Sequence, residues 1–168
     1  VIGIPSMTFG EYDYGPTTGR LIVELANQTL KAYVKGQRNI VSARDAGRGL
    51  LYALEKGKAG ERYLITGENT DMDTLVATIC ERAGVPPLEK TVSINMAKLT
   101  SRLQETRYTL FRGDPPKLSS TAIAVMAGGQ HLDGTKARVE LDYTPDLTMR
   151  DSVDRAYIWF EKNGYIRK

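Results

Sequence analysis

The clearest candidates for chemistry in this sequence are basic side chains that lie close together along the chain. Arg38, Arg44 and Arg48 fall around a short apolar run and the helix expected after it. A guanidinium offers parallel N–H donors, which suit bidentate recognition of phosphate or carboxylate. The alternative is a set of solvated surface arginines, of which some pair locally with Asp45. The residue types alone leave both interpretations open.

A second candidate lies between two glycines. Gly15 and Gly19 enclose Pro16, Thr17 and Thr18 ahead of an expected helix. Backbone N–H groups at such a point can bind an anion. An ordinary glycine-rich turn is the simpler interpretation. The sequence contains neither G-x-G-x-x-G nor G-x-x-x-x-G-K-[ST], the usual phosphate-binding patterns.

Two further patterns are weaker than they look. Tyr52 and Lys56 have a Tyr-x-x-x-Lys spacing, which places both side chains on one helix face, where a Lys lowers the pKa of a Tyr. Lys56 directly precedes Gly57, however, and a Lys is favoured at any helix C-terminus. We interpret this pair as a chance match. His131, the single His, would have to serve any Ser-His-Asp triad, and we interpret it as a surface residue.

Composition narrows the function classes. The chain has 168 residues, a formal charge of +3, 41% hydrophobic and 26% charged residues, which is ordinary for one globular domain. One His and one Cys exclude a zinc cluster built from these residues and a disulfide framework within the chain. No metal site is therefore expected. The basic residues are scattered, so neither nucleic acid nor a membrane is expected as a partner. We expect a cytoplasmic protein, because no leader is recognised and the chain has a single Cys. No apolar run approaches the roughly 18 residues of a membrane span.

The secondary-structure elements that must position these side chains are strands that alternate with helices along the chain. Strands are expected over residues 1–4, 40–41 and 62–66, the first of them buried, and a short extended piece over 91–94. Expected helices cover residues 21–30, 46–55, 72–83, 95–111, 119–127, 134–141 and 149–163. The order predicts an α/β fold with some parallel pairing, in a single unit covering residues 1–168.

Local signals give each helix a start. Thr17 or Thr18 is expected to cap the first helix, and Asp45 the second. The second helix carries Leu50, Leu51 and Leu54 on one side. Thr70 and Asp73 have capping-box spacing, and Asp133 can cap a later helix. The last helix has the strongest signal, since Thr148-x-x-Asp151 precedes apolar residues at i, i+3, i+4 and i+7, namely Val153, Ala156, Tyr157 and Phe160.

Six segments in a fixed order resemble the extended short-chain dehydrogenases/reductases, the NAD-dependent epimerase/dehydratase family that includes dihydroflavonol-reductase-like enzymes. They are residues 4–10 (Pro-Ser-x-x-x-Gly), 38–46, 50–57, 60–67, 133–145 (Asp-x-x-Lys-Ala-x-x-x-Leu-x-Tyr-x-Pro) and the last helix with Trp159 and Phe160. The order and spacing carry the resemblance, since no single segment is specific. It implies the C-terminal part of an NAD(P)-binding Rossmann-like fold with a mostly helical substrate-binding region.

The resemblance assigns roles to a few residues. Pro5 and Ser6 match the turn beside the nicotinamide end of the cofactor. The substrate-lining region corresponds to the loop that ends in Thr17, Thr18 and Arg20. Arg38 matches an Arg that binds the diphosphate of nucleotide sugars.

Some positions carry no such role. Asp45 matches a family Asp that caps its helix, so we interpret it as structural. Asp142 departs from the family's frequent Gly, and the Arg-Gly-Asp run at residues 112–114 lies too far before Asp133 to align as the second phosphate-binding Arg. The doubtful second phosphate-binding Arg favours the reductase-like branch of the family, whose members do not need a nucleotide sugar.

The family's glycine-rich loop, its catalytic Ser and its Tyr-x-x-x-Lys all precede the strand that aligns with residues 1–4. No catalytic residue is therefore assigned in this chain. The sequence begins with Val1 and not with Met, and its first residues are expected to lie within a strand. This suggests a piece of a longer protein, and trimming for expression is the alternative. A proteolytic product without a function of its own is a further possibility.

Two functions follow. The first is the substrate-binding portion of an NAD(P)-dependent epimerase/dehydratase or reductase that acts on a nucleotide sugar or a small carbonyl or hydroxyl substrate. The intact enzyme would use NAD or NADP, and this chain alone would bind neither tightly and would not catalyse. The second is a non-enzymatic binding or regulatory module that keeps the substrate half of the fold. In either case we expect self-association, because the strands at 1–4 and 62–66 would have exposed sheet edges.

Overall fold

Short strands and longer helices alternate along the chain, as expected. The computed structural model describes residues 1–92, 96 and 129–167. Its strands are β1 (Ile2–Pro5), β2 (Met7–Phe9), β3 (Tyr33–Val34), β4 (Gln37–Ser42), β5 (Arg62–Ile65), β6 (Glu68–Asp71) and β7 (Thr91–Val92). Its helices are α1 (Arg20–Ala26), α2 (Ala43–Lys56), α3 (Met72–Ala83), α6 (Thr135–Leu141) and α7 (Met149–Lys162). The helices expected over 95–111 and 119–127 lie outside the described residues.

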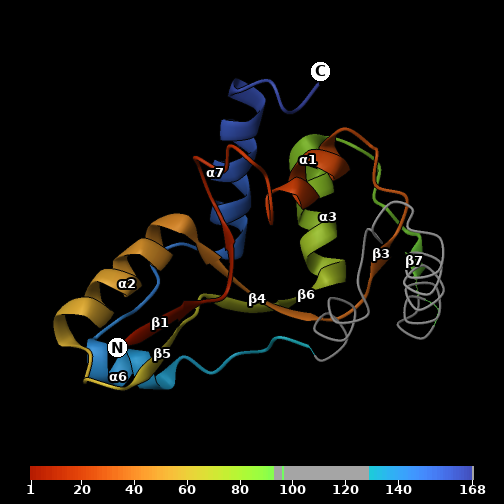
Figure 1. The fold of residues 1–168 in the computed structure, drawn as a ribbon. Helices are drawn as coiled ribbons and strands as arrows, with labels where there is room; N and C mark the ends of the chain where they lie inside the picture. The colour runs from red at the N-terminus through yellow and green to blue at the C-terminus, as the bar shows by residue number, and fades with distance from the viewer. Residues whose placement is uncertain (93–95, 97–128, 168) are drawn as a thin grey trace, which may run out of the picture.

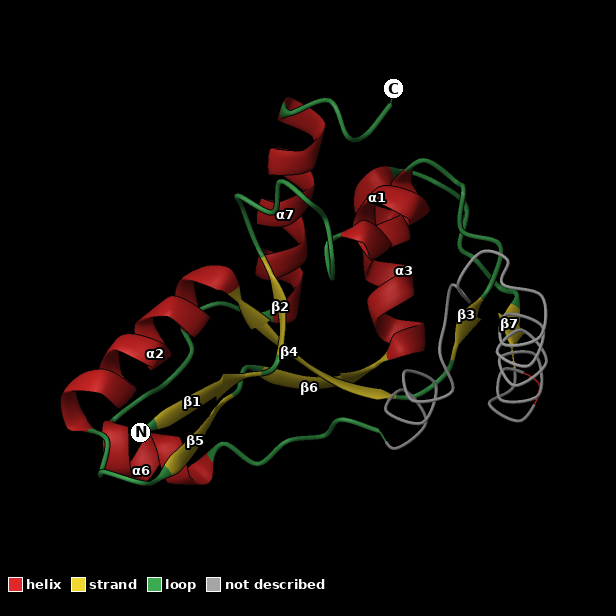
Figure 2. Ribbon diagram, viewed as in Figure 1, coloured by secondary structure: helices red, strands yellow, loops and turns green. Residues whose placement is uncertain are grey.

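The described residues form three small sheets (Figure 2). β1 pairs with β5 in parallel, so that Pro5 lies beside Ile65. β4 is central in the second sheet, parallel to β2 and antiparallel to β6. β3 and β7 form a separate parallel pair. The α/β class with parallel pairing is thus confirmed, whereas β2, β3 and β6 were not predicted, because they are very short or polar.

Each of the two main sheets has its own helical cover and its own core (Figure 1). α3 and α7 pack on the β2-β4-β6 sheet, α1 packs against both of these helices, and the side chains between them are mainly apolar. The largest fully buried ones are Phe9, Ile22, Ile40, Leu75, Ile79 and Phe160, each at most 1% exposed. Burial of such a side chain contributes about 1.5–3 kcal/mol. This cluster is the main stabilising core of the described fold.

The second core is smaller and lies between β5, α2 and α6. It contains Ala53, Tyr63, Ile65, Ala137, Leu141 and Tyr143. Burial raises the pKa of the Tyr143 phenol to about 12, and its hydroxyl donates to the carbonyl oxygen of Thr66. Tyr143 thereby ties the segment after α6 to the end of β5.

The last helix forms as its local signals predict. The Thr148 hydroxyl accepts from the backbone N–H of Asp151, whose carboxylate accepts from the backbone N–H of Thr148, a complete capping box. The predicted apolar face is buried, and Gly164 follows the helix with a φ of 77°. Helix α6 ends at the predicted residue but begins one residue later than predicted, and Gly134, not Asp133, is its N-cap. Asp133 instead accepts from the backbone N–H of Thr135 within the segment before the helix.

The caps predicted for the other helices were wrong by a few residues. Ser42, not Asp45, is the N-cap of α2, and its hydroxyl accepts from the backbone N–H of Asp45. Asp71 caps α3 in place of Thr70, which lies in β6. Neither Thr17 nor Thr18 caps α1, because Gly19 occupies the N-cap position. At α2 and α3 a neighbouring residue of similar capping ability has the extended backbone conformation of an N-cap, whereas Gly19 of α1 provides no side-chain cap.

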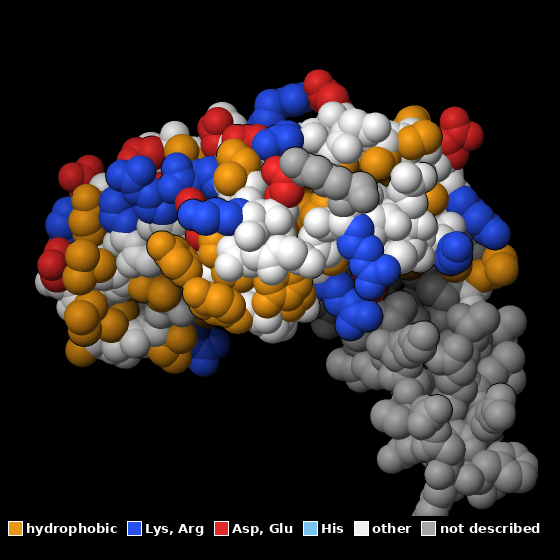
Figure 3. Space-filling view, turned by 90° about the horizontal axis from the view of Figure 1, so that it is seen from above, with side chains coloured by type: hydrophobic (Ala, Val, Ile, Leu, Met, Phe, Trp, Pro, Cys, Tyr) orange, Lys and Arg blue, Asp and Glu red, His pale blue; other side chains and the backbone are white. Residues whose placement is uncertain are grey.

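The first strand forms but is not buried, which corrects the expectation for residues 1–4. Val1, Ile2 and Ile4 are 49%, 51% and 40% exposed, because β5 is the only described strand beside β1. The apolar side of α2 is exposed as well, and the residues it buries are mainly small, Ala46, Gly49 and Ala53. Figure 3 shows hydrophobic side chains gathered at this end of the molecule. We call the surface formed by Val1, Ile2, Ile4, Leu50, Leu51 and Leu54 the apolar face.

Candidate functional site

Ser6 lies where the parallel pair β1-β5 ends, the end at which open α/β sheets bind their ligands. Its backbone N–H donates to the carbonyl oxygen of Ile65 at 3.1 Å, which extends the pairing by one residue beyond Pro5. Its hydroxyl oxygen is buried and has no hydrogen-bond partner among the described residues. A buried hydroxyl without a partner is uncommon in a folded protein. The turn at Pro5 and Ser6 therefore fits a polar ligand group such as a cofactor would bring.

Asn39 joins the two main sheets beside this turn, and the sequence analysis missed it. Its side-chain oxygen accepts from the backbone N–H of Gly67 at 2.9 Å, and its side-chain nitrogen donates to Asn69 at 2.6 Å. Asn39 is fully buried. Because Met7 pairs with Ile40, Ser6 and Asn39 are each one residue before that pair. Asn39 therefore fixes the ends of β5 and β6 next to Ser6.

Arg38 precedes Asn39 on β4 and is on the opposite face of the strand. Only 5% of it is exposed, and its guanidinium donates to the carbonyl oxygen of Gln37 at 2.6 Å. Desolvation by burial lowers the pKa of Arg38 from its usual value. A guanidinium at this position can offer parallel N–H donors to an anionic group such as a phosphate.

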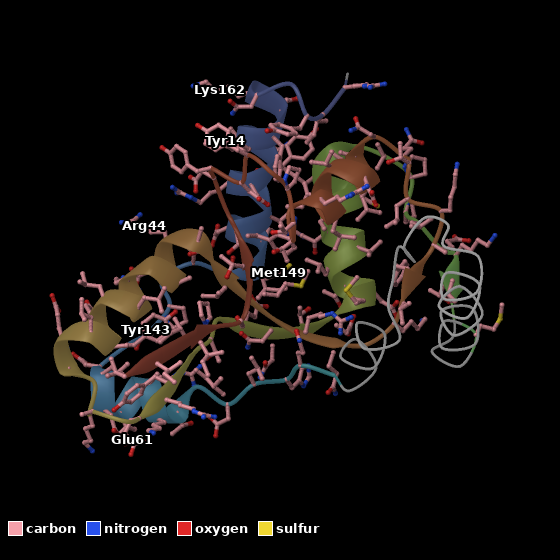
Figure 4. The ribbon with its side chains drawn as sticks, in the orientation of Figure 1. Tyr14, Arg44, Glu61, Tyr143, Met149 and Lys162 are labelled. Atoms are coloured by element: carbon pink, nitrogen blue, oxygen red, sulfur yellow. The ribbon has the colours of Figure 1, made fainter. Side chains whose placement is uncertain are left out.

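Burial separates Arg38 from the other two basic residues of its group. Arg48 forms ion pairs with Asp45, at 3.0 Å, and with Asp146, and the hydrogen bond with Asp146 raises the pKa of Arg48. Arg44 is exposed on the first turn of α2 (Figure 4). Arg48 thus stabilises the fold through local pairing, which was one of the two interpretations left open. Arg38 remains the candidate for ligand binding.

The other three residues assigned to substrate binding, Thr17, Thr18 and Arg20, follow the other end of β2. Thr17 is exposed and Thr18 half-buried in the loop before α1. Arg20 begins α1, and its exposed guanidinium pairs with Glu24 at 2.7 Å. The backbone N–H of Gly19 donates to the carboxylate of Asp13, so this donor is already satisfied and the loop offers an anion one N–H fewer. Ser6 precedes β2, this loop follows it, and Arg38 lies on β4, so three separate segments present the candidate residues.

The residues judged to be chance matches have ordinary structural partners. The Lys56 ammonium donates to the carbonyl oxygen of Leu141 at 3.1 Å and lies 4.7 Å from the centre of the Tyr52 ring. His131 is exposed, with its Nε2 atom 3.0 Å from the carbonyl oxygen of Thr70. Within the described parts of the chain, no three acidic, His or Cys side chains gather to hold a metal ion. Nor is any helix there long and apolar enough to cross a membrane.

The sequence and the structure were both compared with those of known proteins. No family model matches the sequence. A Synechocystis protein named as a dihydroflavonol 4-reductase is 28% identical over 172 residues, which cover 99% of this chain and 50% of that protein. The crystal structure of a nucleoside-diphosphate-sugar epimerase from Pseudomonas aeruginosa is 44% identical, with a TM-score of 0.82, and covers 99% of this chain and 49% of that one. The chain thus spans about half the length of the relatives it matches.

A more distant structure shares the fold. The UDP-glucuronic acid 4-epimerase of Bacillus cereus, crystallised with UDP-glucuronic acid and NAD, has a TM-score of 0.66 at 17% identity. It covers 97% of this chain and 45% of that protein. The resemblance found in the six sequence segments and the arrangement of the strands agree with these comparisons. The chain is therefore similar to the extended short-chain dehydrogenases/reductases, the NAD-dependent epimerases and dehydratases, and its fold matches the C-terminal half of such proteins.

Proposed function

We propose that this chain is the substrate-binding portion of an NAD(P)-dependent epimerase/dehydratase or reductase. Its substrate would be a nucleotide sugar or a small carbonyl or hydroxyl compound. The relatives support this proposal, because one is named as a sugar-nucleotide epimerase and another as a dihydroflavonol reductase. The single observation that carries the proposal is the burial of Arg38, a cationic residue of β4 that directly precedes Asn39. By itself the chain would bind and orient a substrate rather than catalyse.

The residues at the β1 turn fit the cofactor that the family uses. Ser6 would donate or accept a hydrogen bond at the end of the bound NAD or NADP, and Pro5 would border it. When bound, the cofactor supplies the hydride acceptor or donor. Every other function of this chain would be to position the substrate, through Arg38, Thr17, Thr18 and Arg20. Tight cofactor binding would require the part of the relatives that this chain does not span.

Replacing Arg38 by lysine is expected to discriminate the two substrate classes. For UDP-glucose, loss of the bidentate hydrogen bond should weaken binding about tenfold. For a dihydroflavonol, which has no phosphate, affinity should stay within about twofold. Both can be measured by ¹⁵N–¹H correlation spectra of the 168-residue chain. Arg44→Lys, an exposed position on α2, is the matched control. If neither ligand shifts the amide signals of Ser6, Thr17, Thr18, Arg20 or Arg38, the proposed function is wrong.

We also propose that the apolar face mediates self-association. Among the described strands only β5 pairs with β1, so its other edge is open there, and α2 lies beside β1, since a Cβ added to Gly3 would contact Leu50. Parallel sheets are normally covered on both faces, so this pair is left incomplete. A second copy would extend β1 and cover the leucines together.

Sedimentation velocity should therefore show oligomers of this chain at high concentration. Ile2→Lys and Leu51→Lys each place a charge in the contact and should raise the dissociation constant at least tenfold, since about 1.4 kcal/mol is enough for that change. Ile158→Lys is the control, because Ile158 is exposed to a similar extent, 48%, but lies on α7. A monomer at all concentrations, or an equal effect of the control, would contradict the proposal.

A further inference from the structure

The loop between β2 and α1 is held by the opposite end of the chain. The Tyr165 hydroxyl, just beyond α7, donates to the carbonyl oxygen of Tyr14 at 2.6 Å. Arg155 on α7 forms an ion pair with Glu11 at 2.8 Å. Figure 4 shows Tyr14 beside the C-terminal part of α7, where the loop runs along the helix. The loop is therefore attached to α7 at one point and to the segment that follows α7 at another.

Aromatic rings fill the contact between the loop and α7. The ring of Tyr14 meets Trp159 edge-on at 5.0 Å between centroids, and Tyr165 stacks on Trp159 at 5.7 Å. Trp159 is 8% exposed, whereas Tyr14 is 67% exposed. Aromatic pairs of this kind contribute beyond the area that they bury. Trp159 therefore forms a rigid base on which the loop rests.

The end of the loop is fixed with equal tightness, immediately before Arg20. A Cβ added to Gly19 would lie less than 3.0 Å from both the Phe160 ring and the Asp13 carboxylate. That carboxylate accepts from the backbone N–H of Gly19 at 3.2 Å. Phe160 is fully buried. The residue that joins the loop to α1 thus has no freedom to move without displacing the core.

The chain beyond α7 also binds α1 itself. The side-chain nitrogen of Asn27, at the end of α1, donates to the carbonyl oxygen of Tyr165 at 2.8 Å. Its side-chain oxygen accepts from the backbone N–H of Arg167, also at 2.8 Å. Tyr165 consequently contacts the loop through its hydroxyl and α1 through its backbone. Loop and helix are held as one unit around Thr17, Thr18 and Arg20.

We infer that Trp159 and Tyr165 are positioning residues, which hold the loop in the conformation that presents Thr17, Thr18 and Arg20 to the substrate. This inference rests on the proposed function. Polar side chains on an unattached loop would have to be ordered when the ligand binds, and that cost would reduce affinity. Attachment to α7 removes the cost beforehand. A purely structural role for these aromatic residues would change stability but not affinity.

Tyr165→Phe is the sharpest test, because it removes one hydroxyl and keeps the ring. Loss of this hydrogen bond should raise hydrogen–deuterium exchange of amides 10–19 about fivefold and leave α3 unchanged. Trp159 is the only tryptophan, so its emission should report the same change directly. The variant should also bind UDP-glucose or the dihydroflavonol, whichever the native chain binds, about fivefold more weakly. Tyr33→Phe is the control, since it removes a hydroxyl that donates to Asp73 on another part of the surface.

The outcomes separate the two proposals. Faster exchange of amides 10–19 together with weaker binding, absent in the control, supports the inference. Faster exchange with unchanged affinity overturns it, since the loop would then be held without positioning the ligand. Unchanged exchange and emission overturn it as well. If the native chain binds neither probe, the proposed function fails and the positioning role fails with it, although the exchange result still shows whether the attachment exists.

Discussion

Asp45→Ala is expected to lower the free energy of unfolding of this chain by about 3–5 kcal/mol, the usual cost of breaking a buried ion pair from one side. The Asp45 carboxylate is 1% exposed. It accepts from the Ser42 hydroxyl at 2.9 Å and from the Arg48 guanidinium at 3.0 Å. It also accepts from the backbone N–H groups of Asp146 and Leu147, at 3.2 and 3.0 Å. Alanine would leave all these donors without their acceptor.

The position of Asp45 explains why the effect should spread through the fold. The turn at residues 146–147 directly precedes α7, which supplies much of the main core. Asp45 thus connects the first turn of α2 to the start of α7. Urea unfolding followed by Trp159 emission measures the loss, because that ring lies on α7. A domain of this size is stable by roughly 5–15 kcal/mol, so the variant should unfold at a clearly lower urea concentration.

Asp146→Ala is the matched control, because Asp146 binds the same Arg48 but is 60% exposed. Exposed ion pairs contribute little to stability, so this variant should unfold close to the native chain. A small effect of Asp45→Ala, comparable to that of the control, would show that the buried hydrogen bonds contribute little. Asp45→Asn should lower the free energy of unfolding by an intermediate amount. Its amide oxygen can still accept a hydrogen bond, while its NH₂ group would face other donors.

The sequence predicts elements whose signals are local. The last helix begins at the predicted residue and ends one residue before the predicted end, because Thr148, Asp151 and the apolar spacing lie within one continuous stretch. The role of Asp45 was identified only in part, because Ser42 and Asp45 both suit a cap. What distinguishes them is the turn at Asp146 and Leu147, far away in the sequence. Strand β6 was missed since its Glu-Asn-Thr-Asp sequence has no apolar pattern and pairs only because β4 lies beside it.

The candidate site shows the same division. Ser6 and Arg38 were found through the family resemblance, and burial then separated Arg38 from Arg44 and Arg48. Asn39 was not found, because its partners Gly67 and Asn69 come from another strand, and an isolated Asn in an apolar run gave no signal. Exposure of the leucines on α2 was also unexpected. An apolar face on a helix predicts that other apolar side chains pack against it, but it does not predict whether they come from the same chain or from another one.

Gly67→Ala is the other substitution with a large expected effect, a loss of about 3 kcal/mol or more in the free energy of unfolding. The new Cβ would lie less than 3.0 Å from the carbonyl oxygen and carbon of Ile40 and from the Cα of Val41. These are backbone atoms of the central strand β4, which cannot rotate away as a side chain would. Overpacking against a fixed neighbour costs about 1–3 kcal/mol and occasionally more. Displacement of Gly67 would in addition break its hydrogen bond to the buried Asn39.

Gly47→Ala provides a control of opposite sign. Gly47 lies within α2, and a Cβ there meets nothing within 4 Å. Alanine should therefore stabilise the chain by about 0.5–1 kcal/mol, through its lower conformational entropy in the unfolded state and its better helix propensity. Opposite shifts in the midpoint of urea unfolding would attribute the cost at Gly67 to the contact with β4, and not to the loss of a glycine as such. Because Gly67 and Asn39 fix the strand ends beside Ser6, Gly67→Ala should also shift the Ser6 amide signal, while Gly47→Ala should leave it in place.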